Sequence, residues 1–120
     1  MKDNNIVYEK SLNFAVRIVK VYQFLCSEKK EYTMSKQLLR SGTSIGANIS
    51  EAGSAESRPD FIHKLAISQK EAYETRYWLI LLHRTGYLTE KQFQSLISDC
   101  YDLIRLLSAI AVTLKNQSAR

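Results

Sequence analysis

Residues 34–55 read MSKQLLRSGTSIGANISEAGSA, and the pattern in this stretch decides the fold. Apolar and small residues recur at three- and four-residue spacing, which is typical of one helix face: Leu38, Gly42, Ile45, Ile49 and Ala52. Inside a helix, Gly42, Gly46 and Gly53 would each cost about 1 kcal/mol relative to alanine. Close approach of a neighbouring helix is the simplest compensation, so we expect a helix over 34–55 that packs tightly on another. A glycine-rich phosphate loop is the functional alternative, but the stretch lacks a GxxxxGKS or GxxxxGKT motif and a preceding strand.

Residues 6–27 predict a further helix, whose apolar arc is wider than a helix in a monomeric bundle needs. One stripe at helical spacing contains Tyr8, Leu12, Ala15, Val19, Tyr22 and Cys26. The stripe beside it contains Val7, Phe14, Ile18, Val21 and Leu25. Two interpretations stay open: the helix is deeply buried in its own bundle, or the extra stripe is an interface between subunits.

Start and stop signals define a helix over 58–85. Ser57 is a suitable cap, Pro59 lies in the first turn, and Asp60 follows three residues after the cap. Gly86 supplies a left-handed stop. The expected buried face contains Phe61, Leu65, Ser68, Ala72, Thr75, Leu79 and Leu82.

A last helix is expected over 90–116, because Thr89 and Gln92 have the spacing of a capping box. The helix over 34–55 should begin with Thr33 or Ser35 as its cap. Four long helices with short connections, and no strand pattern, predict an all-α fold. Short connections force antiparallel neighbours, so we expect a single four-helix bundle domain over 1–120 with up-down-up-down topology.

Composition narrows the class of protein. The formal net charge is +5, which allows an acidic partner such as nucleic acid. The beginning of the chain has no signal-peptide core and no segment is apolar enough to cross a membrane, so we expect a cytoplasmic protein without a membrane partner. Cys26 and Cys100 are then expected to be buried and reduced, and with His63 and His83 they lack the spacing of a metal site. We expect no metal and no cofactor.

Nothing in the chain predicts catalysis. Glu71 and Glu74 share a helix side, and Glu51 lies on the preceding helix. Such carboxylates are more often surface charges or partners of arginine than an acid and base pair. A carboxylate-bridged metal site in a bundle would need Glu-x-x-His motifs, which are absent. We therefore expect a protein that is not an enzyme.

Two polar surfaces have open interpretations. The first surface lies opposite an apolar stripe and contains Arg40, Ser44, Ala47 and Glu51, with Asn48 at its border. It is either a solvated face or a polar network between helices or subunits. The second surface has His63, Lys70, Tyr77 and Arg84 at seven-residue steps, flanked by Tyr73 and Arg76. It is either an ordinary solvated face or a surface that pairs with phosphates and stacks on bases.

The motif SGTSIGANI, followed by FIHKLAIS and by EA, ET and YWL, resembles an uncharacterised bacterial family called four-helix bundle proteins. The wider family includes proteins encoded by intervening sequences of 23S ribosomal RNA genes, and it is similar to the accessory variability determinant of diversity-generating retroelements. The resemblance covers nearly the whole chain. One departure is Ser50-Glu51-Ala52-Gly53, where many members have Ala-Glu-Gly directly after the Asn-Ile pair.

The resemblance implies a barrel-like homopentamer with a basic surface and, for the retroelement protein, binding of nucleic acid and of a reverse transcriptase. The positions that carry the family motif, and that we expect to serve fold and assembly, are Arg40, Gly42, Ser44, Gly46, Asn48, Glu51, Ser68 and Glu71. For a phosphate backbone of RNA or DNA, the expected diffuse contacts are Arg17, Lys20, Lys70, Arg76 and Arg84. The alternative is an interaction scaffold whose apolar grooves hold a helix of another protein.

Overall fold

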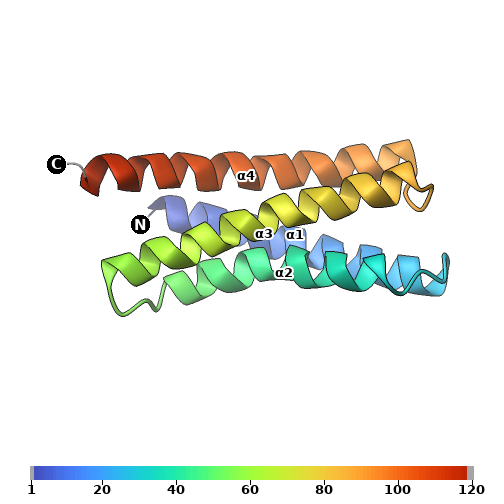
Figure 1. Ribbon diagram of the computed structural model, residues 1–120, viewed down its shortest axis with the longest axis horizontal. Coiled ribbons are helices and arrows are strands. Elements are labelled where there is room, and N and C mark those ends of the chain that lie inside the picture. Colours follow the sequence, from blue (N-terminus) through green and yellow to red (C-terminus); the bar gives the residue numbers. More distant parts are fainter. Residues whose placement is uncertain (1, 119–120) are drawn as a thin grey trace.

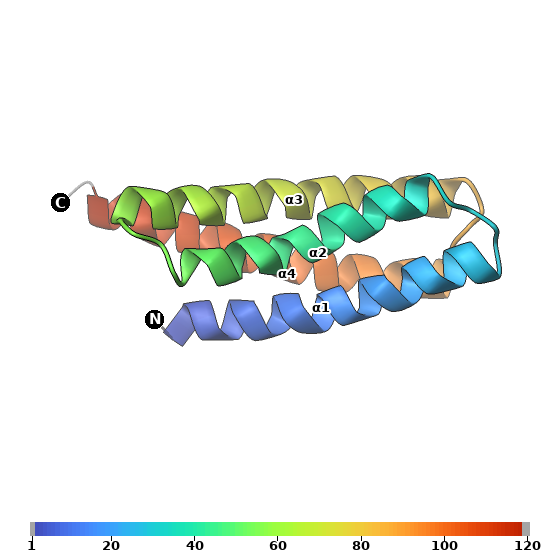
Figure 2. The same cartoon turned by 90° about the horizontal axis from the view of Figure 1, so that it is seen from below.

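The computed structural model describes residues 2–118, and the side chains of residues 6–117. Four helices follow in chain order: α1 (Lys2–Ser27), α2 (Met34–Ala52), α3 (Arg58–Arg84) and α4 (Glu90–Ser118). Each runs antiparallel to the next, so the α1–α2 and α3–α4 connections share one end of the bundle (Figures 1 and 2). The part of the chain that is described contains no strand. The expected all-α, up-down-up-down bundle is confirmed, with extents of 51 × 23 × 20 Å.

The four helices pack in a ring in which α1 contacts α2, α2 contacts α3, and α3 contacts α4. The fourth contact, between α1 and α4, is the sparsest of these pairs, and α1 lies diagonally opposite α3. Figure 2 shows α1 along one edge of the bundle and α3 along the other. This arrangement leaves an outward face on every helix, because each one is covered only by its two neighbours.

Two helix boundaries differ from the expected ones by several residues. α1 begins at Lys2 rather than at residue 6, because the polar residues before Ile6 continue the helix without adding to its apolar stripe. α2 ends at Ala52 rather than at residue 55. There the backbone tightens into bonds between residues three apart, since Ser54 N donates to Glu51 O (3.0 Å) and Ala55 N to Ala52 O (3.1 Å). Gly53 therefore follows the helix instead of lying inside it.

The start and stop signals of α3 and α4 are confirmed. The Ser57 hydroxyl accepts a hydrogen bond from Asp60 N at 3.2 Å. Gly86 adopts a left-handed φ of 86°, and Tyr87 N then donates to Leu82 O at 2.9 Å. At the start of α4, Gln92 N donates to the Thr89 hydroxyl (3.1 Å) and Thr89 N donates to the Gln92 side-chain oxygen (2.9 Å), which is a reciprocal capping box.

The expected cap of α2 is wrong. Thr33 precedes the helix but its side chain makes no capping hydrogen bond, and Ser35 lies inside the first turn. Instead the carboxylate of Glu31 accepts from Ser35 N at 2.7 Å and from Thr33 N at 3.2 Å. The Ser35 hydroxyl donates back to Glu31 O at 2.7 Å. A carboxylate is the better acceptor because its charge also complements the positive end of the helix dipole.

Replacement of Glu31 by alanine should therefore destabilise the bundle by about 1–2 kcal/mol, the usual loss for a helix cap. Burial by itself would raise the pKa of Glu31, but hydrogen bonds from Ser35, Met34 and Thr33 lower it below the ordinary glutamate value. The unfolded chain thus binds this proton more tightly, so the stabilisation is present above about pH 4.5 and is lost as the pH falls through the lower folded pKa. Urea unfolding from pH 7 to pH 3 checks this: Glu31→Ala should lose stability at pH 7 and show a shallower decline in acid. Parallel curves for the two proteins would contradict the assignment.

The buried core shows which of the two apolar stripes of α1 faces the interior of the bundle. Its buried stripe is the second one, with Val7, Phe14, Ile18 and Leu25, and Val21 is partly buried. The predicted face of α3 is buried apart from Phe61, which is only partly covered.

Cys100 is buried, as expected, and burial raises the pKa of its thiol to about 12. Cys26 is only half-buried, which corrects the expectation for that residue, and both cysteines are free.

Tight packing of α1 on α2 explains two of the three glycines. A Cβ added at Gly42 would lie 2.8 Å from Ile18 Cγ2, and one added at Gly46 would lie 3.0 Å from Ser11 Oγ. Ile18 and Ser11 are fully buried. Close approach therefore compensates for the low helix propensity at both positions, as expected, whereas Gly53 lies outside the helix and has no such role.

Candidate functional site

Half of the family-motif residues make contacts between α2 and α3, namely Arg40, Glu51, Ser68 and Glu71. In the buried layer the Ser68 hydroxyl donates to Ile45 O at 2.8 Å. Two turns further along α3, Thr75 Oγ1 lies 3.0 Å from the Ser41 hydroxyl. These small hydroxyl residues let the two helices approach closely while each hydroxyl keeps a partner. The layer fixes the register of α3 on α2.

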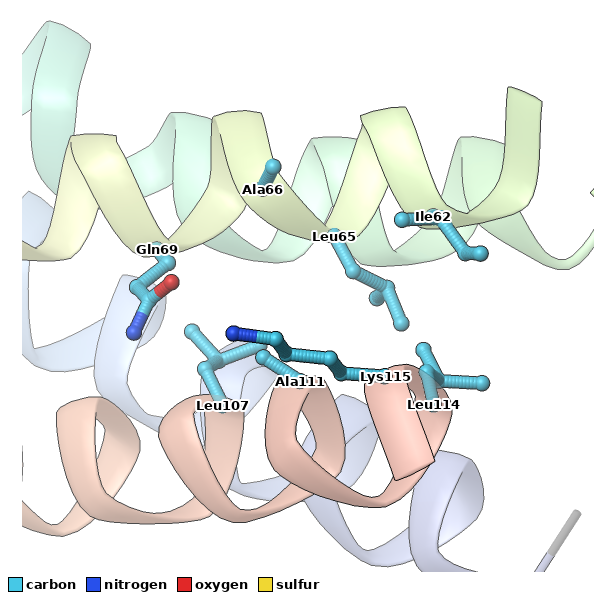
Figure 3. Close-up of a pocket in the computed structure, with 8 residues that line it drawn as sticks. All are labelled: Ile62, Leu65, Ala66, Gln69, Leu107, Ala111, Leu114 and Lys115. Atoms are coloured by element: carbon cyan, nitrogen blue, oxygen red, sulfur yellow. The ribbon is translucent and has the colours of Figure 1, made fainter. Parts of the chain in front are cut away.

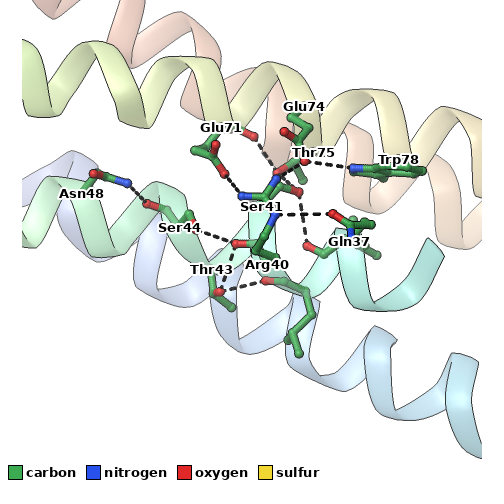
Figure 4. Close-up of polar contacts among 12 residues, drawn as sticks. Gln37, Arg40, Ser41, Thr43, Ser44, Asn48, Glu71, Glu74, Thr75 and Trp78 are labelled. Carbon is green, nitrogen blue, oxygen red and sulfur yellow. Dashed lines mark hydrogen bonds and ion pairs between the residues drawn. The ribbon is translucent and has the colours of Figure 1, made fainter. Parts of the chain in front are cut away.

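The outer layer of this contact is an arginine held by two carboxylates, and we call it the Arg40 clamp: Arg40, Glu71, Glu74 and Trp78 (Figure 4). Arg40 Nη1 donates to Glu71 at 2.9 Å and Nη2 donates to Glu74. Trp78 Nε1 donates to the same Glu74 oxygen at 3.1 Å. Burial opposes the charge of Glu74, but the hydrogen bonds from Trp78 and Arg40 prevail and lower its pKa. The clamp uses both glutamates as partners of one arginine on α2, which is the structural role expected for such carboxylates.

The other motif residues of α2 make local contacts. The Ser44 hydroxyl donates to Arg40 O at 2.6 Å, and Asn48 Nδ2 donates to Ser44 O at 2.8 Å. Glu51 lies 3.8 Å from Lys64 of α3 in an exposed ion pair. The surface is thus a polar network between helices at Arg40 and Glu51. Within one chain the Asn48 amide donates to its own helix, and a contact of Asn48 with another subunit stays a prediction.

The outward face of α3 carries the second predicted surface, which we call the α3 face: His63, Lys70, Tyr73, Tyr77 and Arg84. All five side chains are exposed. The Arg76 guanidinium lies beside this face, 4.8 Å from the centroid of the Tyr73 ring, and the Tyr77 ring meets Trp78 edge-on at 5.0 Å. Because the Arg40 clamp holds Glu71 and Glu74 toward α2, the cations of α3 dominate its outward side.

The five predicted phosphate contacts do not form one surface. Lys70, Arg76 and Arg84 lie on α3, whereas Arg17 and Lys20 lie on α1, diagonally across the bundle. Arg17 is also occupied, since its guanidinium pairs with Asp99 and donates to the Ser95 hydroxyl at 2.7 Å. Helical spacing groups residues on one helix, but it does not show which outward faces of different helices are adjacent.

Three further features lie outside these surfaces: the exposed stripe of α1 had been left open as a subunit interface, and the other two were not predicted as sites. α1 exposes an apolar stripe, with Leu12 at 45%, Val16 at 49% and Val19 at 37% exposure. A cavity of about 280 Å³ lies between α3 and α4 (Figure 3), with Ile62, Leu65, Leu107 and Leu114 among its lining residues and Lys115 lying across it. A larger groove of about 420 Å³ lies between α1 and α4. The wide apolar arc of α1 was the sequence signal for the first feature; the other two have none, since they form between separate helices.

Two further properties of the described residues concern metal ions and membranes. Across residues 2–118, as far as they are described, no group of three or more His, Cys, Asp or Glu could hold a metal ion. Within the same residues, no helix is long and apolar enough to span a bilayer.

Comparison with known proteins identifies the family. Residues 3–109 match the model of the 23S rRNA-intervening sequence protein family. A crystal structure of a protein with unknown function from the S23 ribosomal protein family of Bacteroides thetaiotaomicron VPI-5482 is 58% identical, with a TM-score of 0.89. The alignment covers 91% of this chain and 97% of that one, and no curated protein matches. This four-helix bundle therefore belongs to the 23S rRNA-intervening sequence protein family.

Proposed function

We propose that this chain is a non-catalytic, cytoplasmic helical-bundle protein that assembles with copies of itself and binds RNA or DNA through the α3 face. The observation that carries the proposal is the separation of charge on α3. Its two central glutamates are held by Arg40 of α2, while Lys70 and Arg84 are exposed and form no ion pair with a described residue, and the exposed rings of Tyr73 and Tyr77 lie between them along α3.

Such a surface suits a sequence-tolerant nucleic-acid interface. Lysine and arginine pair with phosphates, and exposed tyrosine rings offer planes on which bases stack. The cation of Arg76 already stacks on Tyr73 and so adds charge beside that ring. The few phosphate contacts of one 13.8 kDa chain would bind nucleic acid weakly. An oligomer repeats these contacts on each subunit and so raises the overall affinity. Arg17 and Lys20 lie on another face, so we leave them out of this interface.

The exposed stripe of Leu12, Val16 and Val19 supports self-assembly. Three exposed aliphatic side chains at adjacent turns of one helix favour burial against another surface. The resemblance to pentameric relatives implies five copies. An interface on α1 would leave the α3 face open, because the two helices lie diagonally opposite in the bundle.

The nucleic-acid proposal is tested by fluorescence anisotropy with a labelled single-stranded RNA and its DNA counterpart, at low salt and over a salt series. The double variant Lys70→Ala, Arg84→Ala should bind at least about tenfold more weakly, with a smaller slope of log K against log salt, since two phosphate contacts are lost. Tyr77→Ala should weaken binding and leave that slope unchanged, because a stacking contact releases no counterion.

Lys115→Ala is the matched control, because Lys115 is an exposed cation on α4, outside the α3 face. Its affinity should equal that of the natural chain. No binding by folded protein at micromolar concentration, or equal losses in the control and in the double variant, would refute a specific role of this face.

A second candidate function is a scaffold for another protein, and the same apolar stripe on α1 favours it. A partner helix could cover Leu12, Val16 and Val19 in place of a second copy. Purification from the native host would then recover one protein in fixed stoichiometry with no nucleic acid, and Val16→Asp would release that protein.

A further inference from the structure

The groove between α1 and α4 has a composition that neither the bundle core nor the α3 face explains. It lies where the α1–α4 contact is sparse, and its volume is about 420 Å³. Its lining consists of Arg17, Lys20, Val21, Phe24, Leu88, Gln92 and Leu96. Leu88 and Leu96 are buried, and Val21 and Phe24 are half-buried, so the groove has an apolar floor open to solvent on one side.

The polar groups of the lining offer hydrogen-bond donors. The Gln92 side-chain oxygen is already used by Thr89 N at 2.9 Å, so its NH2 group is the part that can serve a ligand. Lys20 is exposed, and none of the residues whose side chains are described forms an ion pair with it. The Arg17 guanidinium is held in place by Asp99 and Ser95. No described residue that lines the groove is acidic.

A further cation borders the floor at its other end. The Lys29 ammonium lies 5.9 Å from the centroid of the Phe24 ring. An apolar floor flanked by donors and cations complements an apolar body that carries an anionic acceptor. A neutral apolar ligand would leave the donors without partners, and a cationic one would be repelled.

The length and the volume of the groove favour a small ligand over a protein helix. From Arg17 to Phe24 the groove follows α1 for about 10 Å, at 1.5 Å of rise per residue. That is about two helical turns, whereas a protein helix typically presents three to four turns. The volume instead falls within the range of small-molecule sites, about 300–1,000 Å³.

We propose that the α1–α4 groove binds a small amphipathic anion, namely a medium-length aliphatic carboxylate. Its chain lies on Val21, Phe24, Leu88 and Leu96, and its carboxylate accepts from Lys20 and the Gln92 amide, while the charge of Arg17 is balanced by Asp99. The site is separate from the α3 face, so it stands or falls independently of nucleic-acid binding.

The test is a titration of the full, 15N-labelled chain with decanoate below its micellar concentration, followed by amide chemical shifts. Saturable shifts are expected around Val21, Phe24, Leu88 and Gln92. Decanol should bind about tenfold more weakly or worse, because it lacks the charge-assisted hydrogen bonds, and decyltrimethylammonium should not saturate the site.

Two variants separate charge from shape. Lys20→Met should weaken decanoate binding about tenfold, whereas Lys70→Met, which removes an exposed lysine from α3, should leave it unchanged. Val21→Trp should fill the groove and abolish binding by the folded protein. Equal affinity for the three amphiphiles would overturn the proposal, as would shifts centred on Lys115 or on Leu12 and Val16, an unaffected Lys20→Met variant, or an absence of saturable binding.

Discussion

Replacing Gly42 by valine is expected to destabilise the bundle by about 3 kcal/mol, the upper part of the usual range for overpacking a core. The new Cβ alone would lie 2.8 Å from Ile18 Cγ2 and 2.9 Å from Ile18 Cγ1. Ile18 is fully buried and branched at Cβ, so it has no free rotamer into which it can move. α1 and α2 must then separate, which opens voids along the contact. Urea unfolding at fixed protein concentration measures the loss.

Alanine at the same position separates packing from helix propensity. Propensity favours Gly42→Ala by about 1 kcal/mol, so any net destabilisation reports the contact with Ile18. The reverse change at an exposed position of α2, Ala47→Gly, should cost about 1 kcal/mol and calibrates the propensity. Adding Ile18→Ala to Gly42→Val should recover part of the loss, because it removes the atoms that clash. A Gly42→Ala variant stabilised by the full propensity difference would show that the helices do not meet tightly there.

Replacing Val16 by aspartate is expected to convert the assembled protein into folded monomers of 13.8 kDa, measured by light scattering after size-exclusion chromatography. Val16 is 49% exposed within the bundle, so the change removes little from the core and helicity should be retained. At an interface, however, the aspartate carboxylate would lose its hydration and lie beside the apolar side chains of Leu12 and Val19 on the same helix. An unpaired charge buried in that way costs several kcal/mol at each contact, which is enough to dissociate an oligomer at micromolar concentration.

Val112→Asp is the matched control, because Val112 is a more exposed valine, at 58%, on α4. It introduces the same charge outside the α1 stripe and should leave the mass unchanged. The natural chain is expected to have a mass several times 13.8 kDa. A natural chain that is monomeric at micromolar concentration, or a Val16→Asp protein that assembles as before, would contradict the interface on α1.

Local patterns were enough to predict the helices and most of their ends. Ser57, Gly86 and the pair Thr89 and Gln92 act within a few residues of chain, so their chemistry is readable without any tertiary information. The cap of α2 was missed, although it too is local. Glu31 lies before the expected cap, and a glutamate folding back onto the first turn is a less common pattern than a capping serine or threonine.

The candidate surfaces depended more on the tertiary structure. The Arg40 clamp joins residues 31 and 34 positions apart. The sequence indicated that Glu71 and Glu74 share a helix side and could pair with an arginine, but it did not show that Arg40 is that arginine. Likewise, α1 carried two apolar stripes, and only the packing of α2 and α4 decided that Ile18 of one stripe is buried while Leu12 and Val19 of the other are exposed. A period of 3.6 residues specifies the spacing of a face but not the direction in which it points.

The sequence by itself determined an all-α, antiparallel bundle of four helices, because helix periodicity, caps and short connections are local and admit few alternatives. It also determined that Gly42 and Gly46 mark a close contact, since the low helix propensity of glycine needs a compensating gain. Only the tertiary structure decided which helix makes that contact, which stripe of α1 remains exposed, and where the α1–α4 groove forms. These features depend on how outward faces of separate helices are placed around the bundle, and that placement follows from the packing of all four helices together.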